Sequence, residues 1–439
     1  MTIGGYRLAL AALGTGLLFL QGIGLCLQAA ASFDGVIAVA LAEGATYLAA
    51  VYCISRVPTN RRTLLLILVT AALLRLGTVV FPPYLSTDVY RYVWDGRVQA
   101  AGINPYRYIP ADDALASLRD EAIYPHINRA DYAHTIYPPA AQIIYFVVTR
   151  ISERVTAMKL AMLVFDAATI GFLVLLLRGL GAPPDRVLIY AWHPLTLWEI
   201  AGSGHVDAVV VAFLVLALLA RQRRMPVLAG VSIALGTLVK LFPLVIAPAV
   251  YRPWDWRMPA ALGITVVVFY LPYLSAGSGV LGFLPVYLGE ERLASGSGFY
   301  ILQLASFLSG QSNLPVVPYL GGIGVAFACT AVFVSFRCWK SNDSYLTGSL
   351  ILAIVFFVFV TPHYPWYYLW LLPLLCLVSY WPALLLTVAS FLLYAVLEER
   401  SPAREFLVNS LLYGSFMLAA LIHLCVHRRQ SIAATQAKS

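Results

Sequence analysis

The stretch STDVYRYVWDGRVQAAGINPYRYIPADD, residues 86–113, gathers carboxylates, guanidinium groups and phenols in a chain that is otherwise strongly apolar. Asp88 stands near its start, and a carboxylate within reach of a hydroxyl accepts the proton as that hydroxyl attacks an electrophile. Asp88 is therefore a candidate general base, although Thr-Asp before an apolar run is equally typical of a helix N-terminus. Asp95 is expected on the same helical face, paired with Arg91 four residues before it.

Other polar side chains stand beside or within apolar segments, where each charge is costly unless it is paired or hydrated. The side chains that are candidates for binding a phosphate group are Lys240, His363, Lys159 and Arg91. Those that are candidates for hydrogen bonding to, or stacking on, a sugar are His205, Asp207, Glu199, Tyr90, Trp94 and Tyr106. Structural roles stand beside these: a loop position for His205, an interfacial aromatic belt around His363, and a salt bridge between Glu199 and Lys159.

The elements that position these groups are membrane helices. The 439 residues are 61% hydrophobic and 11% charged, and the mean hydropathy of +0.81 lies far outside the range of soluble globular proteins. Repeated apolar runs of about 15 to 25 residues fit helices that cross roughly 30 Å of hydrocarbon, and the alternation of a membrane barrel is missing. We predict an all-α polytopic membrane protein with about 12 to 14 transmembrane helices.

No metal centre and no cofactor is expected. The six cysteines show no CxxC pair and no Cys/His ligand spacing, so neither disulfides nor zinc are predicted. Asp88 and Asp95 are separated by six residues, unlike the DxD arrangement that holds a divalent ion on a phosphate. The net charge of +8 is scattered in small groups, which argues against a nucleic-acid partner.

The basic groups instead predict the topology. If the apolar runs alternate across the bilayer, these groups share one side, which the positive-inside rule assigns to the cytoplasm. They are Arg56, Arg61, Arg62, Arg221, Arg223, Arg224, Arg252, Arg257, Arg337, Lys340, Arg428 and Arg429. Both termini are then cytoplasmic. A loop of about fifty residues after the third apolar run (63–81) and a second large loop over 275–317 are expected on the outer face.

Two segments do not fit single spans. The apolar part of 137–155 is too short to cross, and we expect a helix half-immersed from the outer face. In RRMPVLAGVSIALGTLVKLFPLVIAPAVYRPWDWR, two short helices meeting near Lys240 keep the basic ends on one side. Lys240 is then left at membrane depth, where broken backbone must line protein or a wet cavity. A single kinked helix with Lys240 snorkelling is the alternative.

Several motifs together resemble a known family: STDVYRYVWDGRVQAAGINPYRY, YPPAAQ, HPLTLWEIAGSGHVDAVV, LGTLVKLFPLVIAPAVY and TPHYPWYYLWLLP. In this order they resemble the polyprenyl-phosphate-sugar-dependent glycosyltransferases of the GT-C superfamily, nearest the family 87, mannosyltransferase-like branch. The resemblance covers about residues 82–380. It divides a single membrane domain into additional N-terminal helices (1–62), a catalytic core (63–380), C-terminal helices (381–427) and a cytoplasmic tail (428–439).

The resemblance implies transfer of one sugar, with mannose favoured, from a polyprenyl-phosphate carrier to a lipid- or glycan-linked hydroxyl. It implies inversion, action at the non-cytoplasmic face of the membrane, and Asp88 as the acidic residue that acts as base. The only glycosylation sequon, Asn342-Asp343-Ser344, falls on the predicted cytoplasmic side, which favours a bacterial inner membrane. The resemblance also implies short juxtamembrane helices, for which residues 89–101 and 138–150 fit. Two alternatives stand: a glycan polymerase or ligase using a lipid pyrophosphate, indicated by Arg91, Arg97 and Arg107, and a lipid-linked sugar flippase.

Overall fold

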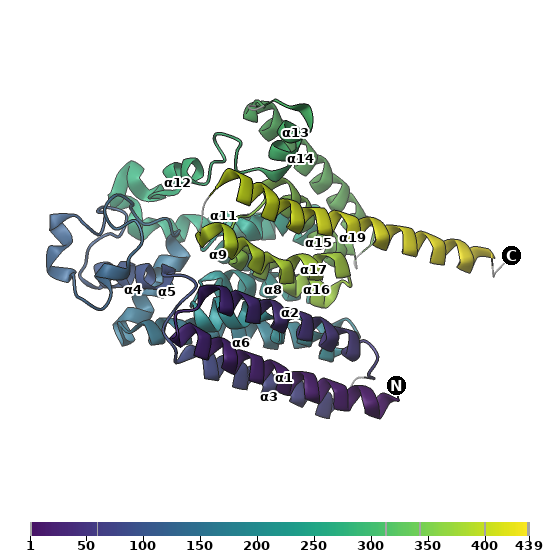
Figure 1. The fold of residues 1–439 in the computed structure, drawn as a ribbon. Helices are drawn as coiled ribbons and strands as arrows, with labels where there is room; N and C mark the ends of the chain where they lie inside the picture. The colour runs from purple at the N-terminus through teal and green to yellow at the C-terminus, as the bar shows by residue number, and fades with distance from the viewer. Residues whose placement is uncertain (1, 59, 312–313, 342–343, 399–400, 437–439) are drawn as a thin grey trace.

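The computed structural model describes residues 2–58, 60–311, 314–341, 344–398 and 401–436, and the side chains of Arg428 and Arg429 lie outside this description. Within the described ranges the chain forms helices and loops and no strand, which confirms the all-α class. Both termini lie at one end of the helical bundle, and α4 (Asp88–Ala100), α5 (Pro139–Ile151) and α12 (Leu284–Glu290) lie at the other (Figure 1).

Seven helical stretches of the described chain are long and apolar enough to cross a membrane. They are α1 (Ile3–Ala29), α2 (Phe33–Ile54), α3 (Arg61–Val79), α6 (Val155–Gly179), the stretch Arg257–Tyr287 that begins with α11 (Arg257–Tyr270), α14 (Val316–Lys340), and Pro402–Val426 within α19 (Pro402–Gln436). The π-helical turn Thr196–Gly202 and α8 (Asp207–Gln222) add an eighth if taken as one span bent by 116°. The chain is therefore a multi-pass membrane protein.

Shorter apolar helices account for the remaining spans that the sequence predicts. They include α9 (Pro226–Thr237), α15 (Ser344–Val360), the stretch Pro365–Leu377 that ends with α16 (Leu372–Leu377), and the stretch Trp381–Leu397 that contains α17 (Trp381–Ala389) and most of α18 (Tyr394–Glu398). Each has fewer residues than the roughly 20 that a helix needs to cross hydrocarbon unaided. The expectation of 12 to 14 spans counted these short helices as full crossings.

The break expected near Lys240 is present. α9 ends at Thr237, and the chain resumes as a 3-10 turn at Phe242–Ile246 followed by α10 (Ala247–Val250). Pro243 has no N–H to continue the helical hydrogen bonds. The carbonyl of Leu238 that the break frees accepts the backbone N–H of Ala140 at 3.0 Å, in the first turn of α5. The free carbonyl at the end of α9 and the free N–H at the start of α5 therefore bond to each other, and α5 packs against the break beside Lys240.

The two short helices predicted in the first large loop are α4 and α5, and a buried cluster ties them together. Asp95 accepts hydrogen bonds from Arg91 Nε at 2.8 Å and from Gln142 Nε2 at 2.9 Å. The hydroxyl of Thr135, in the intervening loop, also donates to this carboxylate. The structural role expected for Asp95 as the partner of Arg91 is thus confirmed.

Buried polar groups that the sequence did not single out brace the bundle behind the loop. Arg75 of α3 pairs with Asp166 of α6 and donates to the carbonyl of Ala191 at 2.7 Å. Glu43 of α2 accepts the indole N–H of Trp198 at 2.7 Å. These contacts fix the π-helical turn Thr196–Gly202 against α2 and α3, and so join the N-terminal helices to the rest of the core.

Candidate active site

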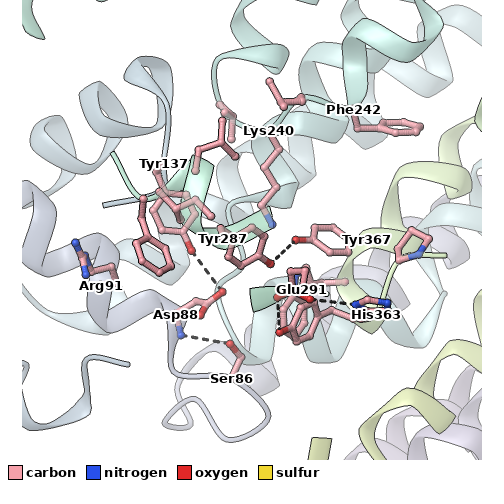
Figure 2. A pocket seen from close by; sticks show the side chains of 18 of the residues that line it. Ser86, Asp88, Arg91, Tyr137, Lys240, Phe242, Tyr287, Glu291, His363 and Tyr367 are labelled. Carbon is pink, nitrogen blue, oxygen red and sulfur yellow. Dashed lines mark hydrogen bonds and ion pairs between the residues drawn. The ribbon is translucent and has the colours of Figure 1, made fainter. Parts of the chain in front are cut away.

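A cavity of about 600 Å³ opens where the loops at the far end of the bundle meet the broken helix. Its wall is formed by residues within 84–91, 128–138, 239–245, 283–293 and 356–370, together with Leu397. Asp88 and Lys240 both line this space, with Tyr137 and Tyr287 beside them (Figure 2). The main geometric expectation, that a carboxylate and a cation remote in sequence share one pocket, is met.

Asp88 occupies the first turn of α4, where the positive end of the helix dipole favours a carboxylate. Its Oδ1 accepts the amide N–H of Asn128 at 2.9 Å, and its Oδ2 lies 3.4 Å from the hydroxyl of Tyr137. The side chain remains 20% exposed toward the cavity. The N-cap residue of α4 is Thr87, whose side chain makes no capping hydrogen bond, and the Asp88 carboxylate lines the cavity, where it can meet a ligand.

Lys240 projects its ammonium into the cavity from the break after α9. Nζ lies 2.6 Å from Oδ2 of Asp207 and 4.8 Å from the ring centre of Tyr367. Asp207 is fully buried, and its other oxygen accepts the indole N–H of Trp370 at 2.8 Å. An ammonium has three N–H donors, so the pairing orients Lys240 and leaves donors for a second anion.

Arg129 is a second cation on the wall, and the sequence analysis did not single it out. Its Nε donates to Glu290 at 2.9 Å, and its guanidinium lies 5.9 Å from the ring centre of Tyr287. The side chain is 29% exposed. Because Arg129 and Glu290 come from the two large loops, this ion pair holds one loop against the other beside the cavity.

His363 lines the cavity and is paired with Glu291 of the second large loop (Figure 2). Nδ1 of His363 lies 3.1 Å from Glu291, and Nε2 lies 2.7 Å from the carbonyl oxygen of Gly298. Burial opposes charging of the imidazole, but the two hydrogen bonds and the Glu291 charge raise the pKa of His363 above its usual value. Burial likewise opposes ionisation of Glu291, but its bonds to His363 and Tyr364 lower its pKa.

Glu291→Gln is expected to flatten the pH dependence of stability. Because the pKa of His363 is raised on folding, its stabilising contribution is complete below its usual 6.5 and is lost as pH rises through the folded value. Because the pKa of Glu291 is lowered, its contribution is complete above its usual 4.5 and is lost as pH falls through the folded value. The thermal unfolding midpoint of the wild type should therefore fall as pH rises above about 6.5. An equal slope in Glu291→Gln would contradict the pairing.

The remaining phosphate-binding candidates have protein partners. Arg91 lines the wall, but its guanidinium binds Asp95 and the carbonyl of Ala133 at 3.2 Å. Lys159 lies outside the cavity, and its Nζ donates to the carbonyl of Phe81 at 2.6 Å instead of pairing with Glu199. Lys240 and Arg129 are therefore the cations best placed to meet a bound phosphate, because both ring nitrogens of His363 are already bonded to Glu291 and Gly298.

The sugar-binding candidates are mostly buried behind the wall. His205, Asp207 and Glu199 are fully buried and do not line the cavity. Trp94 and Tyr106 are also buried, and the Tyr106 hydroxyl donates to the carbonyl of Tyr137 at 2.7 Å. The ring centre of Tyr90 lies 4.6 Å from that of His126, with the ring planes tilted by 31°, outside the cavity. The aromatic side chains that line it are Tyr84, Tyr137, Phe242, Phe283, Tyr287, Phe356, Tyr364, Trp366, Tyr367 and Trp370, and the last four come from the quoted motif TPHYPWYYLWLLP.

Of the three arginines that indicated a pyrophosphate enzyme, only Arg91 lines the cavity. Arg97 pairs with Glu153 at 2.9 Å and with Asp120 at 2.7 Å. Arg107 lines a separate, shallow cavity with Tyr106 and the segment 275–282. In the part of the chain that the structure describes, no group of three or more His, Cys, Asp or Glu side chains is arranged around a metal position.

Comparison with known proteins identifies the family to which the chain is similar. The model of the family described as alpha-(1->6)-mannopyranosyltransferase, N-terminal domain, matches residues 2–255, which is more than half of the chain. Alpha-(1->6)-mannopyranosyltransferase A from Mycobacterium tuberculosis is 23% identical over 321 residues, which cover 66% of this chain and 60% of that relative. The chain thus spans less than two thirds of the relative's length. No solved structure matches the chain.

Proposed function

Because this chain belongs to the alpha-(1->6)-mannopyranosyltransferase family, we propose that it transfers one mannose from a polyprenyl-phosphate carrier to a hydroxyl of a lipid- or glycan-linked acceptor. The reaction takes place in the 600 Å³ cavity. The observation that carries the proposal is that Asp88 and Lys240, from the first outer loop and the broken helix, line the same space. The family membership agrees with the mannosyltransferase-like resemblance of the motifs.

Asp88 is the base. The acceptor oxygen forms a bond to the anomeric carbon of the donor as the bond from that carbon to the phosphate oxygen breaks. The electron pair of the broken bond leaves with the phosphate, and the acceptor proton passes to the Asp88 carboxylate. The leaving group is already a stable anion, so no second carboxylic acid is required to protonate it, in contrast to glycoside hydrolysis.

Lys240, supported by Arg129, binds the donor phosphate and stabilises the charge that grows on its bridging oxygen, and His363 holds the cavity wall beside them through its bond to Glu291. The cavity also has an apolar side for the prenyl chain, formed by Val239, Leu241, Phe242, Val245, Phe356 and Val360. Leu241 is 57% exposed, which suits contact with lipid next to Lys240. A phosphate site bordered by an apolar, open wall fits a lipid-linked donor better than a nucleotide sugar, whose base and ribose need polar contacts.

Stereochemistry limits the donor. An α-(1→6) product formed by one displacement, with inversion, requires a β-linked mannosyl phosphate. The acceptor oxygen is then a primary hydroxyl, which reaches a narrow site more easily than a ring hydroxyl. The aromatic wall of Tyr287, Tyr364 and Tyr367 offers faces on which the sugar rings of donor and acceptor stack.

The cavity faces the non-cytoplasmic side of a bacterial inner membrane, with both termini in the cytoplasm. Two observations support this orientation: the termini lie at the end of the bundle away from α4, α5 and α12 (Figure 1), and the basic loop groups of the sequence fall on the side of the termini if the spans alternate. A lipid-linked donor is the form of activated sugar suited to that face, because nucleotide sugars are made in the cytoplasm.

The test is a transfer assay with the purified full chain in lipid. The donors are radiolabelled β-mannosyl polyprenyl phosphate, its α anomer, the glucosyl analogue and guanosine diphosphate mannose, each with mannoside acceptors that have a free or a blocked 6-hydroxyl. We expect transfer from the β-mannosyl lipid to the free 6-hydroxyl with an α linkage in the product. Transfer from the nucleotide sugar alone, or from none of the donors, would contradict the proposal.

A further inference from the structure

His205 is a fully buried histidine whose ring nitrogens have no hydrogen-bond partner within the described part of the chain. Carboxylates face both of them. Nδ1 lies 3.8 Å from Oδ2 of Asp88, and Nε2 lies 3.5 Å from Oε2 of Glu199. An orphaned polar side chain in a protein interior is costly, so its place directly behind the proposed base calls for a functional explanation.

The ring is held firmly in this position. Its backbone N–H donates to the carbonyl of Glu199 at 2.9 Å, which closes the π-helical turn Thr196–Gly202, and such turns occur often at functional sites. Gly204, just before His205, has a φ of +75°, and a Cβ there would lie 2.9 Å from Cγ of Lys159. The imidazole stacks on Trp366 with ring centres 4.2 Å apart. The backbone and the stacking therefore aim the two nitrogens at Asp88 and Glu199.

A neutral imidazole has one N–H donor and one lone pair, so it is satisfied between two carboxyl groups only if one of them is protonated. Glu199 is the more enclosed of the two: its side chain is 0% exposed, whereas that of Asp88 is 20% exposed. Asp88 faces the open cavity, while Glu199 receives a neutral donor, the Tyr394 hydroxyl, at 2.8 and 3.0 Å. Because Glu199 is buried and its hydrogen-bond donor is uncharged, its carboxyl group is more stable in the protonated, neutral form.

We propose that His205 and Glu199 are positioning residues for Asp88, an inference that rests on the proposed function. Glu199 donates its acid proton to Nε2 of His205, and this sets the tautomer in which Nδ1–H donates to Oδ2 of Asp88. The Asp88 carboxylate is thereby held in place and turned toward the acceptor hydroxyl. No proton leaves His205 during transfer. The distances of 3.5 and 3.8 Å shorten when substrates fill the cavity, as catalytic hydrogen bonds commonly do.

This assignment replaces the sugar-binding role that the sequence indicated for His205 and Glu199. Neither side chain lines the cavity, so neither is placed to touch a sugar there. Their influence on transfer passes through Asp88, which does line it. The role predicts an effect on turnover rather than on donor binding, and it predicts that the two residues act as one unit.

Measurements of kcat and KM distinguish a positioning role of His205 and Glu199 from a role in packing alone. His205→Ala should lower kcat by about tenfold to a hundredfold, with KM for the donor little changed. Glu199→Leu should do the same, and the double variant should be no worse than either single variant. Glu199→Gln should retain most of the activity, because its amide N–H replaces the acid O–H toward Nε2. Equal losses in Glu199→Gln and Glu199→Leu would overturn the proposal.

A second readout needs no turnover and so separates this inference from the proposed function. The full chain, with its 7 histidines labelled with ¹⁵N, is studied in lipid bilayers by solid-state nuclear magnetic resonance, and His205→Gln identifies the His205 signals. We expect a neutral imidazole protonated at Nδ1, unchanged in Glu199→Gln and altered in Glu199→Leu. An imidazolium, or a ring protonated at Nε2 alone, would overturn the assignment. The other histidine signals report whether each variant is folded.

Discussion

Asp88→Asn should lower the rate of mannosyl transfer by at least about a hundredfold while the protein folds normally and still binds the donor. The amide has nearly the shape of the carboxylate, so the contacts with Asn128 and Tyr137 have room to form again. The variant loses the basic carboxylate oxygen that takes up the proton of the acceptor hydroxyl as the new bond forms. The measurement is single-turnover transfer in lipid, with donor binding followed separately.

Asp95→Asn is the matched control, because Asp95 lies on the same helix and is also a carboxylate. It is 1% exposed and accepts from Arg91 and Gln142, so its loss leaves the buried Arg91 charge without its partner. We expect a lower unfolding midpoint, and in the fraction that folds a smaller loss of turnover than in Asp88→Asn. Near-normal turnover of folded Asp88→Asn would remove Asp88 as the base.

Lys240→Met should also lower transfer strongly, by about a hundredfold, because the donor phosphate loses the cation that stabilises charge on its leaving oxygen. Methionine retains much of the length of the side chain and its contact with Tyr367, so packing is altered little. The variant has a second effect, since Asp207 is fully buried and would be left with only the Trp370 hydrogen bond. Stability is expected to fall as well.

The double variant Lys240→Met/Asp207→Asn separates these two effects. With the charge of Asp207 also removed, no unpaired buried carboxylate remains, and the unfolding midpoint should return toward that of the wild type. Transfer should stay low, because the phosphate still lacks its cation. If the double variant recovered transfer together with stability, Lys240 would be a structural residue only, and the phosphate would be bound elsewhere.

The sequence predicts those features that depend on local patterns. The basic residues at both ends of the segment 223–257 anticipate the break after α9, and the short apolar run at 137–155 anticipates α5, while α4 was expected from the family resemblance. The pairing of Asp95 with Arg91 follows from helical spacing and is observed. These features require knowledge of only one stretch of chain at a time.

What the sequence misses depends on where segments meet in the plane of the membrane. A predicted topology gives only the depth of a residue in the membrane. Lys159 and Lys240 are predicted on the same side, yet of the two only Lys240 lines the cavity. The second large loop shows no strong period, so the pairing of Glu291 with His363 and of Glu290 with Arg129 was not anticipated. A run of three charged residues, Glu290–Arg292, was the available signal in that loop.

The most direct test of the account is a structure of the full chain in lipid with a bound, non-transferable phosphonate analogue of β-mannosyl polyprenyl phosphate. We predict the phosphonate beside the Lys240 ammonium, the prenyl chain leaving past Leu241, and the anomeric carbon facing Asp88 across a space that admits an acceptor hydroxyl. An analogue seated at another site, or one whose anomeric carbon is separated from Asp88 by its own phosphonate, would contradict it.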